Sequence, residues 1–422
     1  MEKAKSGGIF SAVGAVTGLG NAFRFPALCA KYGLSFIFAY ALCLALIGYP
    51  LLCAELSFGR SKDKKSSKFA LFIMRLACAN SAVIALYYGV IACRLSGACI
   101  NFAVCGSLNS SNIWAYISAL FIFPAVFFIL KKGNNALNIT GKISVFAFLS
   151  IFSYLAVKGI TYGSFKFNFT NLICGEVWAE AVGQTLLSLS LAGGVMPNCA
   201  RTMPQTSLFF TAFKIVIANF LGCGLAQLAV CPVLLDTDVE GGIACAFTVY
   251  PQVIYALSSV EAVRRIFGAM LYGALTAVSI HSLCSLATPL LSHFNSKGLP
   301  AFLFCLLSAL IAPVLCLNDC SALSACDRVA CCITAVLVAF LECLLFANGV
   351  FNNRIIGFLL KFVCPIVCGA SSFLSVCSAR FFMFSSLSLT LAVCAGAFPL
   401  VYALLPLTKK LKNKFIVKLN AP

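Results

Sequence analysis

Charged side chains are scarce in this chain. Only 10% of the 422 residues are Asp, Glu, Lys or Arg, whereas 61% are hydrophobic, and the mean hydropathy is +1.01. Soluble globular domains carry about 25% charged residues. The composition therefore excludes a soluble globular protein and predicts a chain that lies largely within a lipid bilayer.

Histidine is nearly absent as well, with only His281 and His293 in the whole chain. The 24 cysteines lie mostly inside apolar stretches, where a free cysteine behaves as a small hydrophobic residue. A zinc site needs cysteine and histidine ligands grouped at short spacing, and the sequence has no such group. No phosphate-binding loop or nucleophile–base pair is visible, so we do not expect an enzyme. Cys105 and Cys174, in predicted external loops, are candidates for a disulfide.

Apolar stretches long enough to cross a bilayer, which takes about 20 residues, recur along the chain. We predict an all-α membrane protein, one transmembrane domain over residues 1–422. The predicted spans are 8–29, 34–57, 69–105, 113–130, 142–160, 179–200, 207–235, 262–291, 299–317, 328–349, 355–376 and 383–406.

Positive charge outweighs negative charge, with 30 Lys and Arg residues against 12 Asp and Glu residues. With these spans, most basic residues fall in loops on the side of both termini, and most acids fall on the other side. Cytoplasmic loops of membrane proteins are enriched in Lys and Arg. We therefore expect a multi-pass protein of the cell membrane with both termini in the cytoplasm. Its basic tail, residues 407–422, is expected to meet anionic lipid and not nucleic acid.

The first span is interrupted. Its apolar run ends at Val16, and the next ten residues contain two glycines, Asn21, Arg24 and Pro26. Unwound backbone within a membrane is tolerated only where it is buried in protein or lines a cavity. An interruption of this kind is the best sequence indication of a transporter binding site.

A second interruption lies in the sixth span, between Gln184 and Gly194, where Ser188 and Ser190 precede a pair of glycines. Small residues also allow close packing of membrane helices, and that alternative applies to this span. Close packing does not require Asn21 and Arg24 of the first span. Interruptions five spans apart predict an inverted repeat. Its halves are residues 1–160 with helices 1–5 and residues 179–349 with helices 6–10, followed by helices 11–12 over 355–406.

The strings GLGN at Gly18–Asn21 and RFP at Arg24–Pro26 resemble helix 1 of the neurotransmitter:sodium symporters, the family of LeuT and the monoamine transporters. Weaker similarity continues at Gly48–Pro50, Tyr87-Tyr88, Gly183–Leu191 and Gly273–Thr276. The resemblance implies a LeuT-like fold of about twelve transmembrane helices, with a 5+5 inverted repeat and broken helices 1 and 6. It also implies a sodium-coupled symporter that imports an amino acid or a related small amine by alternating access.

The resemblance implies a substrate site at the two interruptions. The Tyr88 hydroxyl and the backbone amides of Leu19 and Gly20 would bind a carboxylate. Because Gly193 stands where relatives often carry a large side chain, the pocket is expected to be roomy. Two of the implied residues have an alternative role. Tyr88 could be a tyrosine at the membrane interface, and His281 could form a hydrogen bond between helices. The implied substrate-binding residues are Val16, Leu19, Gly20, Ile84, Tyr88, Leu187, Ser188, Ser190, Gly193, Ala277 and His281.

The resemblance also implies ion sites and a gate. The first sodium site would use Val16, Asn21, Ser188 and Asn219, with a helix–helix hydrogen-bonding role as the alternative for Asn219. The second site would use Gly14, Thr17, Gly273 and Thr276, with Ala277 in place of a second hydroxyl. Tyr40, Gln184, Ser188 and Asn219 would suit a chloride ion, and Arg24 with Asp327 would form an outer gate. Proton coupling, exchange, or a sensor that does not transport are the alternatives on the same fold.

Overall fold

The computed structural model describes residues 7–61, 68–108, 113–162, 172–204, 206–234, 242–294, 298–316, 321–346, 353–378 and 393–404. All regular secondary structure in these ranges is helical. The first half contains α1 (Gly7–Val16), the π-helical turn η1 (Gly20–Arg24), α2 (Phe25–Tyr32), α3 (Leu34–Cys43), η2 (Leu44–Gly48), α4 (Tyr49–Arg60), α5 (Lys68–Cys105), α6 (Ile113–Lys132) and α7 (Asn134–Tyr162).

The second half starts with another broken pair, α8 (Gly175–Ser188) and α9 (Val195–Ala200). It continues with α10 (Leu208–Leu234), α11 (Gly242–Leu257), α12 (Glu261–Leu291), α13 (Gly298–Cys316), α14 (Ser321–Asp327), η3 (Arg328–Thr334), α15 (Ala335–Phe346), α16 (Arg354–Phe358), η4 (Leu359–Val363) and α17 (Cys364–Ser378). A last apolar helix covers Val393–Leu404.

Each predicted span coincides with a helix or with a broken pair of helices. In the described ranges, eight helices are long and apolar enough to cross a membrane. The prediction missed α11, whose 16 residues are too few to stand out as a span. The predicted basic tail lies outside the described residues. Cys105 and Cys174 are free thiols, so the candidate disulfide is not formed.

Prolines explain three of the four π-helical turns. Pro26, Pro50 and Pro365 each stand two residues after such a turn ends. Proline has no backbone N–H and its ring collides with the carbonyl four residues earlier. A wider π-helical turn before the proline gives that carbonyl room while the helix continues.

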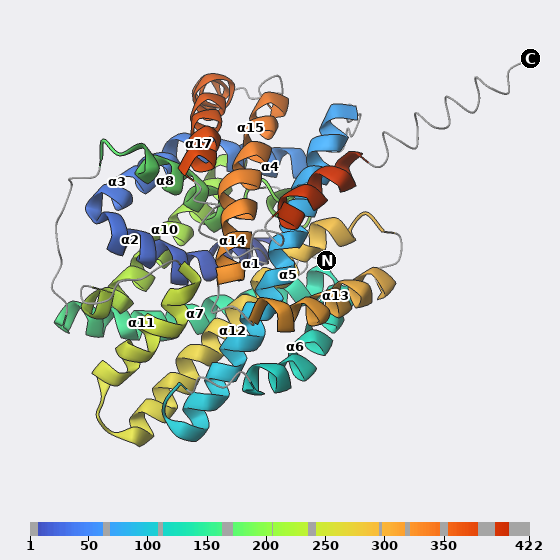
Figure 1. The fold of residues 1–422 in the computed structure, drawn as a ribbon. Helices are drawn as coiled ribbons and strands as arrows, with labels where there is room; N and C mark the ends of the chain where they lie inside the picture. Colours follow the sequence, from blue (N-terminus) through green and yellow to red (C-terminus); the bar gives the residue numbers. More distant parts are fainter. Residues whose placement is uncertain are drawn as a thin grey trace, which may run out of the picture.

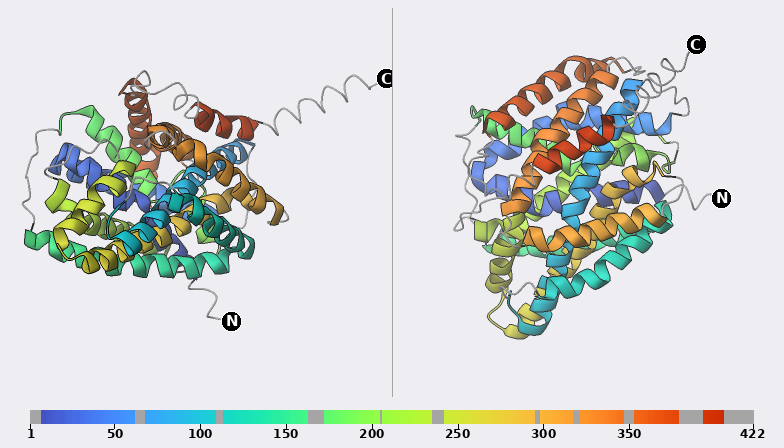
Figure 2. Two further views of the ribbon diagram at one scale, coloured as in Figure 1. Left: turned by 60° about the horizontal axis from the view of Figure 1, so that its bottom comes forward. Right: turned by 45° about the vertical axis from the view of Figure 1, so that its right-hand side comes forward.

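Helices α5 and α12 cross the middle of the molecule side by side (Figure 1). Helices α6 and α13 pack together along one flank, as both views in Figure 2 show, and α15 packs on α17 at the top of Figure 1. The broken helix that begins with α1 contacts α7, α10 and α12. Its polar residues are therefore held at the centre of the bundle, where Asn21 is fully buried.

Helices α7 and α10 pack backbone against backbone at Gly159. A Cβ atom added to Gly159 would overlap the backbone carbonyl of Leu228, whereas one added to Gly224 on α10 would meet no atom within 4 Å. We expect Gly159→Ala to lower the free energy of unfolding by about 1–3 kcal/mol, because backbone cannot move aside cheaply. Gly224→Ala should leave stability unchanged or raise it by up to about 1 kcal/mol. Thermal unfolding of both purified variants checks this, and equal melting temperatures would contradict the packing argument.

Candidate functional site

The two broken helices are joined by hydrogen bonds from side chains to backbone. Gln184 on α8 donates its Nε2 to the carbonyl of Gly20 at 3.1 Å, and Ser190 donates its hydroxyl to the carbonyl of Ala15 at 3.2 Å. Breaking a helix leaves its carbonyls without helical partners, and buried backbone groups need replacements. The second broken helix therefore supplies donors to the first, to the Ala15 carbonyl and to the Gly20 carbonyl, which also accepts the backbone N–H of Phe25.

A first cavity lies where the two breaks face α5 and α12. Six residues of the predicted substrate site line it: Leu19, Gly20, Tyr88, Leu187, Ser188 and Ser190. The other lining residues are Ala15, Gly18, Asn21, Ser282 and Leu286. Val16 lies at the same break, where its carbonyl accepts a hydrogen bond from Asn21.

A second cavity continues from the first and shares three lining residues with it, Leu187, Ser190 and Leu286. Ile84 and Gly193, predicted at the side-chain end of the substrate site, line this cavity. Ala277 and His281 line neither of the two cavities. Instead, this end is completed by Asn80, Ser81, Leu186, Leu191, Ala192, Cys331 and Ala335.

Asn21 is the centre of a buried polar network. Its Nδ2 donates to the Val16 carbonyl at 2.7 Å and to Asn219 Oδ1 at 2.9 Å. Asn219 in turn donates its Nδ2 to the hydroxyls of Tyr40 at 2.7 Å and Ser188 at 3.2 Å, and these two hydroxyls lie 2.8 Å apart. The four residues of the predicted first sodium site thus belong to one connected cluster, with Tyr40 beside it.

The cluster has the composition of a site for a hard monovalent cation. It offers a carbonyl at the end of a half-helix together with amide and hydroxyl oxygens, the kind of donor set that unwound helices use for sodium. Asn21 Oδ1 is buried and has no hydrogen-bond partner among the described residues. An unpartnered buried acceptor is costly, and a cation would relieve that cost. Gln184, predicted to join the chloride ligands, is turned towards the Gly20 carbonyl.

On α12, the residues predicted for the second sodium site, Gly273 and Thr276, do not face α1 in this structure. Thr276 is partly exposed and its hydroxyl bonds the carbonyl of Tyr272 in its own helix. Gly273 faces Cys99 of α5. Gly14 on α1 instead faces His281, since a Cβ on Gly14 would lie 2.7 Å from His281 Nε2. Five residues separate Thr276 from His281, which turns the helix by about 140°, so the predicted residues point away from α1.

His281 connects three helices and is fully buried. Its Nδ1 lies 3.0 Å from the Thr140 hydroxyl on α7, and its Nε2 lies 3.2 Å from the Ser11 carbonyl on α1 and 3.3 Å from the Ser285 hydroxyl. Because a carbonyl only accepts, Nε2 is the protonated ring nitrogen, and it donates a hydrogen bond to the Ser11 carbonyl. The alternative interpretation, a helix–helix hydrogen-bonding residue, matches these contacts. Thr17, also predicted for the second sodium site, donates its hydroxyl to the Val13 carbonyl one turn earlier at 2.9 Å.

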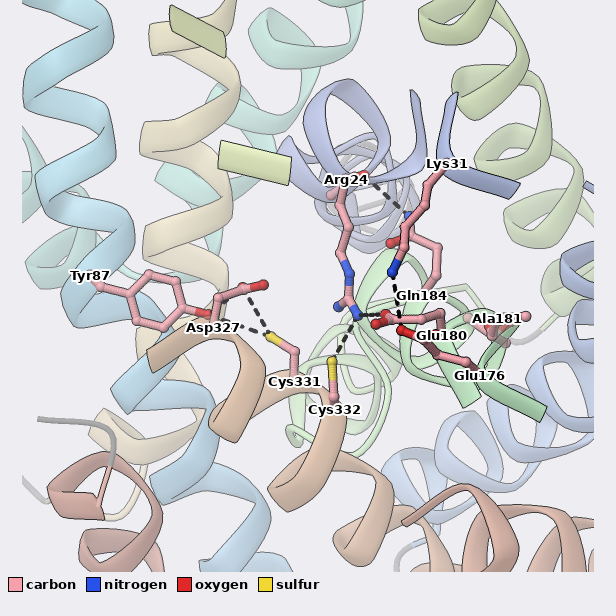
Figure 3. Close-up of polar contacts among 12 residues, drawn as sticks. Arg24, Lys31, Tyr87, Glu176, Glu180, Ala181, Gln184, Asp327, Cys331 and Cys332 are labelled. Atoms are coloured by element: carbon pink, nitrogen blue, oxygen red, sulfur yellow. Dashed lines mark hydrogen bonds and ion pairs between the residues drawn. The ribbon is translucent and has the colours of Figure 1, made fainter. Parts of the chain in front are cut away.

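Arg24 pairs with a carboxylate that the sequence analysis did not select. Its Nη2 lies 2.8 Å from Glu180 Oε2 on α8 and 2.8 Å from Cys332 Sγ on η3 (Figure 3). Asp327 instead accepts a hydrogen bond from the Tyr87 hydroxyl at 2.9 Å. In this conformation the predicted Arg24–Asp327 pair is replaced by Arg24–Glu180. The spacing of the sequence could have indicated Glu180 as a partner, because it stands one helical turn before Gln184 and so lies on the same face of α8.

A second ion pair, between Lys31 and Glu176 at 3.0 Å, lies nearer the surface of the same region (Figure 3). Glu176 precedes the predicted sixth span. Its partial burial opposes ionisation, but the hydrogen bond from Lys31 and the positive charge of Lys31 lower the pKa of its carboxyl.

The break between α8 and α9 contains unusual backbone. Ser190, Ala192 and Gly194 have φ angles of 51°, 56° and 71°, in the left-handed region that costs a non-glycine residue about 1 kcal/mol or more. The fully buried carboxylate of Glu55 on α4 accepts a hydrogen bond from the Ala192 N–H at 2.8 Å. This contact holds the strained segment in place from a neighbouring helix.

The chain is similar in sequence to sodium-dependent transporters. Residues 3–144 match the model of the sodium:neurotransmitter symporter family. An uncharacterized sodium-dependent transporter of Methanocaldococcus jannaschii is 26% identical over 343 residues, 69% of this chain and 68% of the relative. The inactive sodium-dependent neutral amino acid transporter B(0)AT3 of Homo sapiens is 27% identical over 290 residues, 54% of this chain and 45% of that protein. The chain thus spans about half the length of some relatives.

The fold is also similar to a solved structure. The crystal structure of MhsT in complex with L-phenylalanine superimposes with a TM-score of 0.77, covering 87% of this chain and 98% of that chain at 19% identity. The likeness identifies the LeuT-like fold, with its broken first and sixth helices.

The Arg24–Glu180 pair should contribute measurably to stability, because its side chains are only 10% and 17% exposed. We expect Glu180→Ala to lower the free energy of unfolding by about 1–3 kcal/mol, since it leaves a buried guanidinium unpaired. Glu176→Ala, which removes the pair whose side chains are 53% and 39% exposed, should cost below about 1 kcal/mol. Melting temperatures of the two variants in detergent compare them directly. A larger loss for Glu176→Ala would refute this ranking.

The hydrogen bond that Glu55 accepts from Ala192 can be tested separately from the charge of Glu55. Glu55→Ala leaves the buried Ala192 N–H without an acceptor, and we expect a loss of about 1–3 kcal/mol in unfolding free energy. Glu55→Gln keeps an oxygen at the same place and should be less harmful. The measurement is thermal unfolding, with limited proteolysis to detect loosening near Ala192. Equal effects of the two substitutions would show that the hydrogen bond is not what matters.

Proposed function

We propose that this chain, which belongs to the sodium:neurotransmitter symporter family, is a sodium-coupled symporter that imports an amino acid or a related small amine by alternating access. As a multi-pass member of a transporter family with the LeuT-like fold, it is not an enzyme. The observation that carries the proposal is the pair of facing helix breaks, which encloses a cavity and a buried polar cluster at mid-bundle.

The cavity suits a zwitterion. The hydroxyl of Tyr88 and the amides of Leu19 and Gly20, at the start of the second half-helix, favour a carboxylate. Backbone carbonyls near the ends of α1 and α8, with the Ser190 hydroxyl, favour an ammonium group. Both kinds of partner face one cavity inside the helix bundle, where such contacts are stronger than at the surface.

Sodium and substrate are expected to bind interdependently. The donors around Asn21 are all uncharged, so a bound sodium ion has no protein carboxylate in this cluster to balance it. A substrate carboxylate in the adjoining cavity would supply the negative charge, which makes the two affinities reciprocal. The hydroxyl and amide donors of Tyr40, Ser188 and Asn219 make chloride the alternative source of that charge.

Arg24 would act at the outer side of the cavity. We expect its guanidinium to exchange Glu180 for Asp327 when the site closes, as the gate predicted from the sequence requires. Cys332, five residues after Asp327, already contacts Arg24, so the segment that carries Asp327 borders the guanidinium. Both termini are proposed to be cytoplasmic, on the basis of the charge distribution of the loops.

Uptake into proteoliposomes tests the function itself. With an inward sodium gradient we expect accumulation of at least one of the twenty amino acids, and none when potassium replaces sodium. Equal uptake under both gradients would favour proton coupling or exchange. No uptake, together with sodium-dependent binding, would favour a sensor.

Substitutions in the polar cluster test the ion site. We expect Asn21→Ala and Ser188→Ala each to weaken sodium and substrate binding together by about tenfold or more, because each removes a buried oxygen worth about 1–3 kcal/mol. Thr276→Ala is the matched control, since it also removes a hydroxyl but on the partly exposed face of α12. Sodium titrations of ligand binding to purified protein give the affinities. Weaker binding in Thr276→Ala alone would contradict both the assignment of Asn21 and Ser188 to the ion site and the exclusion of Thr276 from it.

A further inference from the structure

Asn80 on α5 presents an unused acceptor at the far end of the second cavity. Its side chain is 1% exposed, and its Nδ2 donates to the carbonyl of Ala330 on η3 at 3.1 Å. Because that partner is an acceptor, the contact assigns the nitrogen and oxygen of the amide without ambiguity. Oδ1 has no hydrogen-bond partner in the ranges that the structure covers.

The other polar groups around this cavity are already engaged. The Ser81 hydroxyl donates to the Leu286 carbonyl at 2.9 Å, and the Ser190 hydroxyl donates to the Ala15 carbonyl. Cys331 contacts Asp327 at 3.4 Å. The remaining walls are aliphatic, and Gly193 contributes no side chain. Among the described side chains that line this cavity, Asn80 Oδ1 is the buried polar atom without any hydrogen bond, so a ligand donor would gain most there.

We propose that Asn80 is a specificity-determining residue, whose Oδ1 accepts a hydrogen bond from a donor at the end of a long substrate side chain. The inference rests on the proposed function, because it places the amino and carboxyl groups of an amino acid at the first cavity. Asn80 precedes Tyr88 by eight residues, which is about 12 Å along a helix. With its carboxylate held at Tyr88, a substrate needs a long side chain to extend two helical turns along α5 towards Asn80, and the phenol of tyrosine combines length with a donor.

Tyrosine and phenylalanine form the discriminating pair, since they differ by one hydroxyl. Phenylalanine in this position would keep Oδ1 buried and unpaired, whereas tyrosine would pair it. Sites built to bind a hydroxyl discriminate against ligands that lack it. A single neutral hydrogen bond contributes about 0.5–1.5 kcal/mol, so we expect roughly fivefold tighter binding of tyrosine.

The test is equilibrium binding of tyrosine and of phenylalanine to the full-length purified protein in saturating sodium. Asn80→Leu should abolish the preference for tyrosine or reverse it. Asn101→Leu is the matched control, because Asn101 lies on the same helix, is 3% exposed, and also has an unpartnered Oδ1, but lines neither cavity. That variant should keep the roughly fivefold preference. Asn80→Ser, with a shorter side chain that still offers a donor to Ala330, replaces Asn80→Leu if the latter does not fold.

Equal affinities of the two ligands for the wild-type protein would overturn the inference without a variant, as would an unchanged ratio in Asn80→Leu or a ratio lost equally in Asn101→Leu. Sodium-dependent binding with any of these results would leave the proposed function intact and remove only the role of Asn80. Failure of all twenty amino acids to bind in sodium would overturn both.

Discussion

The need to satisfy backbone groups freed inside a membrane governs this structure. Two helices are interrupted at mid-bundle, and lipid offers no hydrogen bonds to the exposed carbonyls and amides. The Ala15 carbonyl accepts from Ser190 of the other broken helix, and the Val16 carbonyl accepts from Asn21 within its own break. Gln184 adds a second donor to the Gly20 carbonyl, which also accepts the Phe25 N–H. The polar centre of the molecule follows from this requirement, and so does the close approach of the two breaks.

Around the two facing breaks, charge and solvent exposure increase with distance from the Asn21 cluster. The Asn21 cluster is uncharged and fully enclosed, whereas the charged pair Arg24–Glu180 lies beside it with limited exposure and Lys31–Glu176 lies further out. Uncharged oxygens at the centre suit an ion that must enter and leave, since a buried carboxylate would bind it more strongly. Strained backbone at Ser190 and Ala192 is retained at the same place, held by Glu55.

Local sequence signals were sufficient for much of this arrangement. The spans followed from apolar length, and the two breaks from glycine, proline and polar residues where apolar ones were expected. Asn21, Ser188, Asn219 and Tyr40 were selected through resemblance to a family motif, and the structure joins them in one hydrogen-bonded cluster. The selection of Gly273 and Thr276 rested on a four-residue string without a distinctive residue, and so short a string does not fix the register of a long helix.

The sequence by itself determined that the chain crosses a membrane, where its helices run and where two of them are interrupted. These properties depend on the hydropathy and backbone chemistry of neighbouring residues. Only the tertiary structure decided that His281 faces α1, that Arg24 meets Glu180, and that Asn80 closes the second cavity with a free acceptor. These contacts join residues far apart in the chain. They are set by how each helix is rotated and shifted against its neighbours, and a rotation of one residue, about 100°, changes every partner.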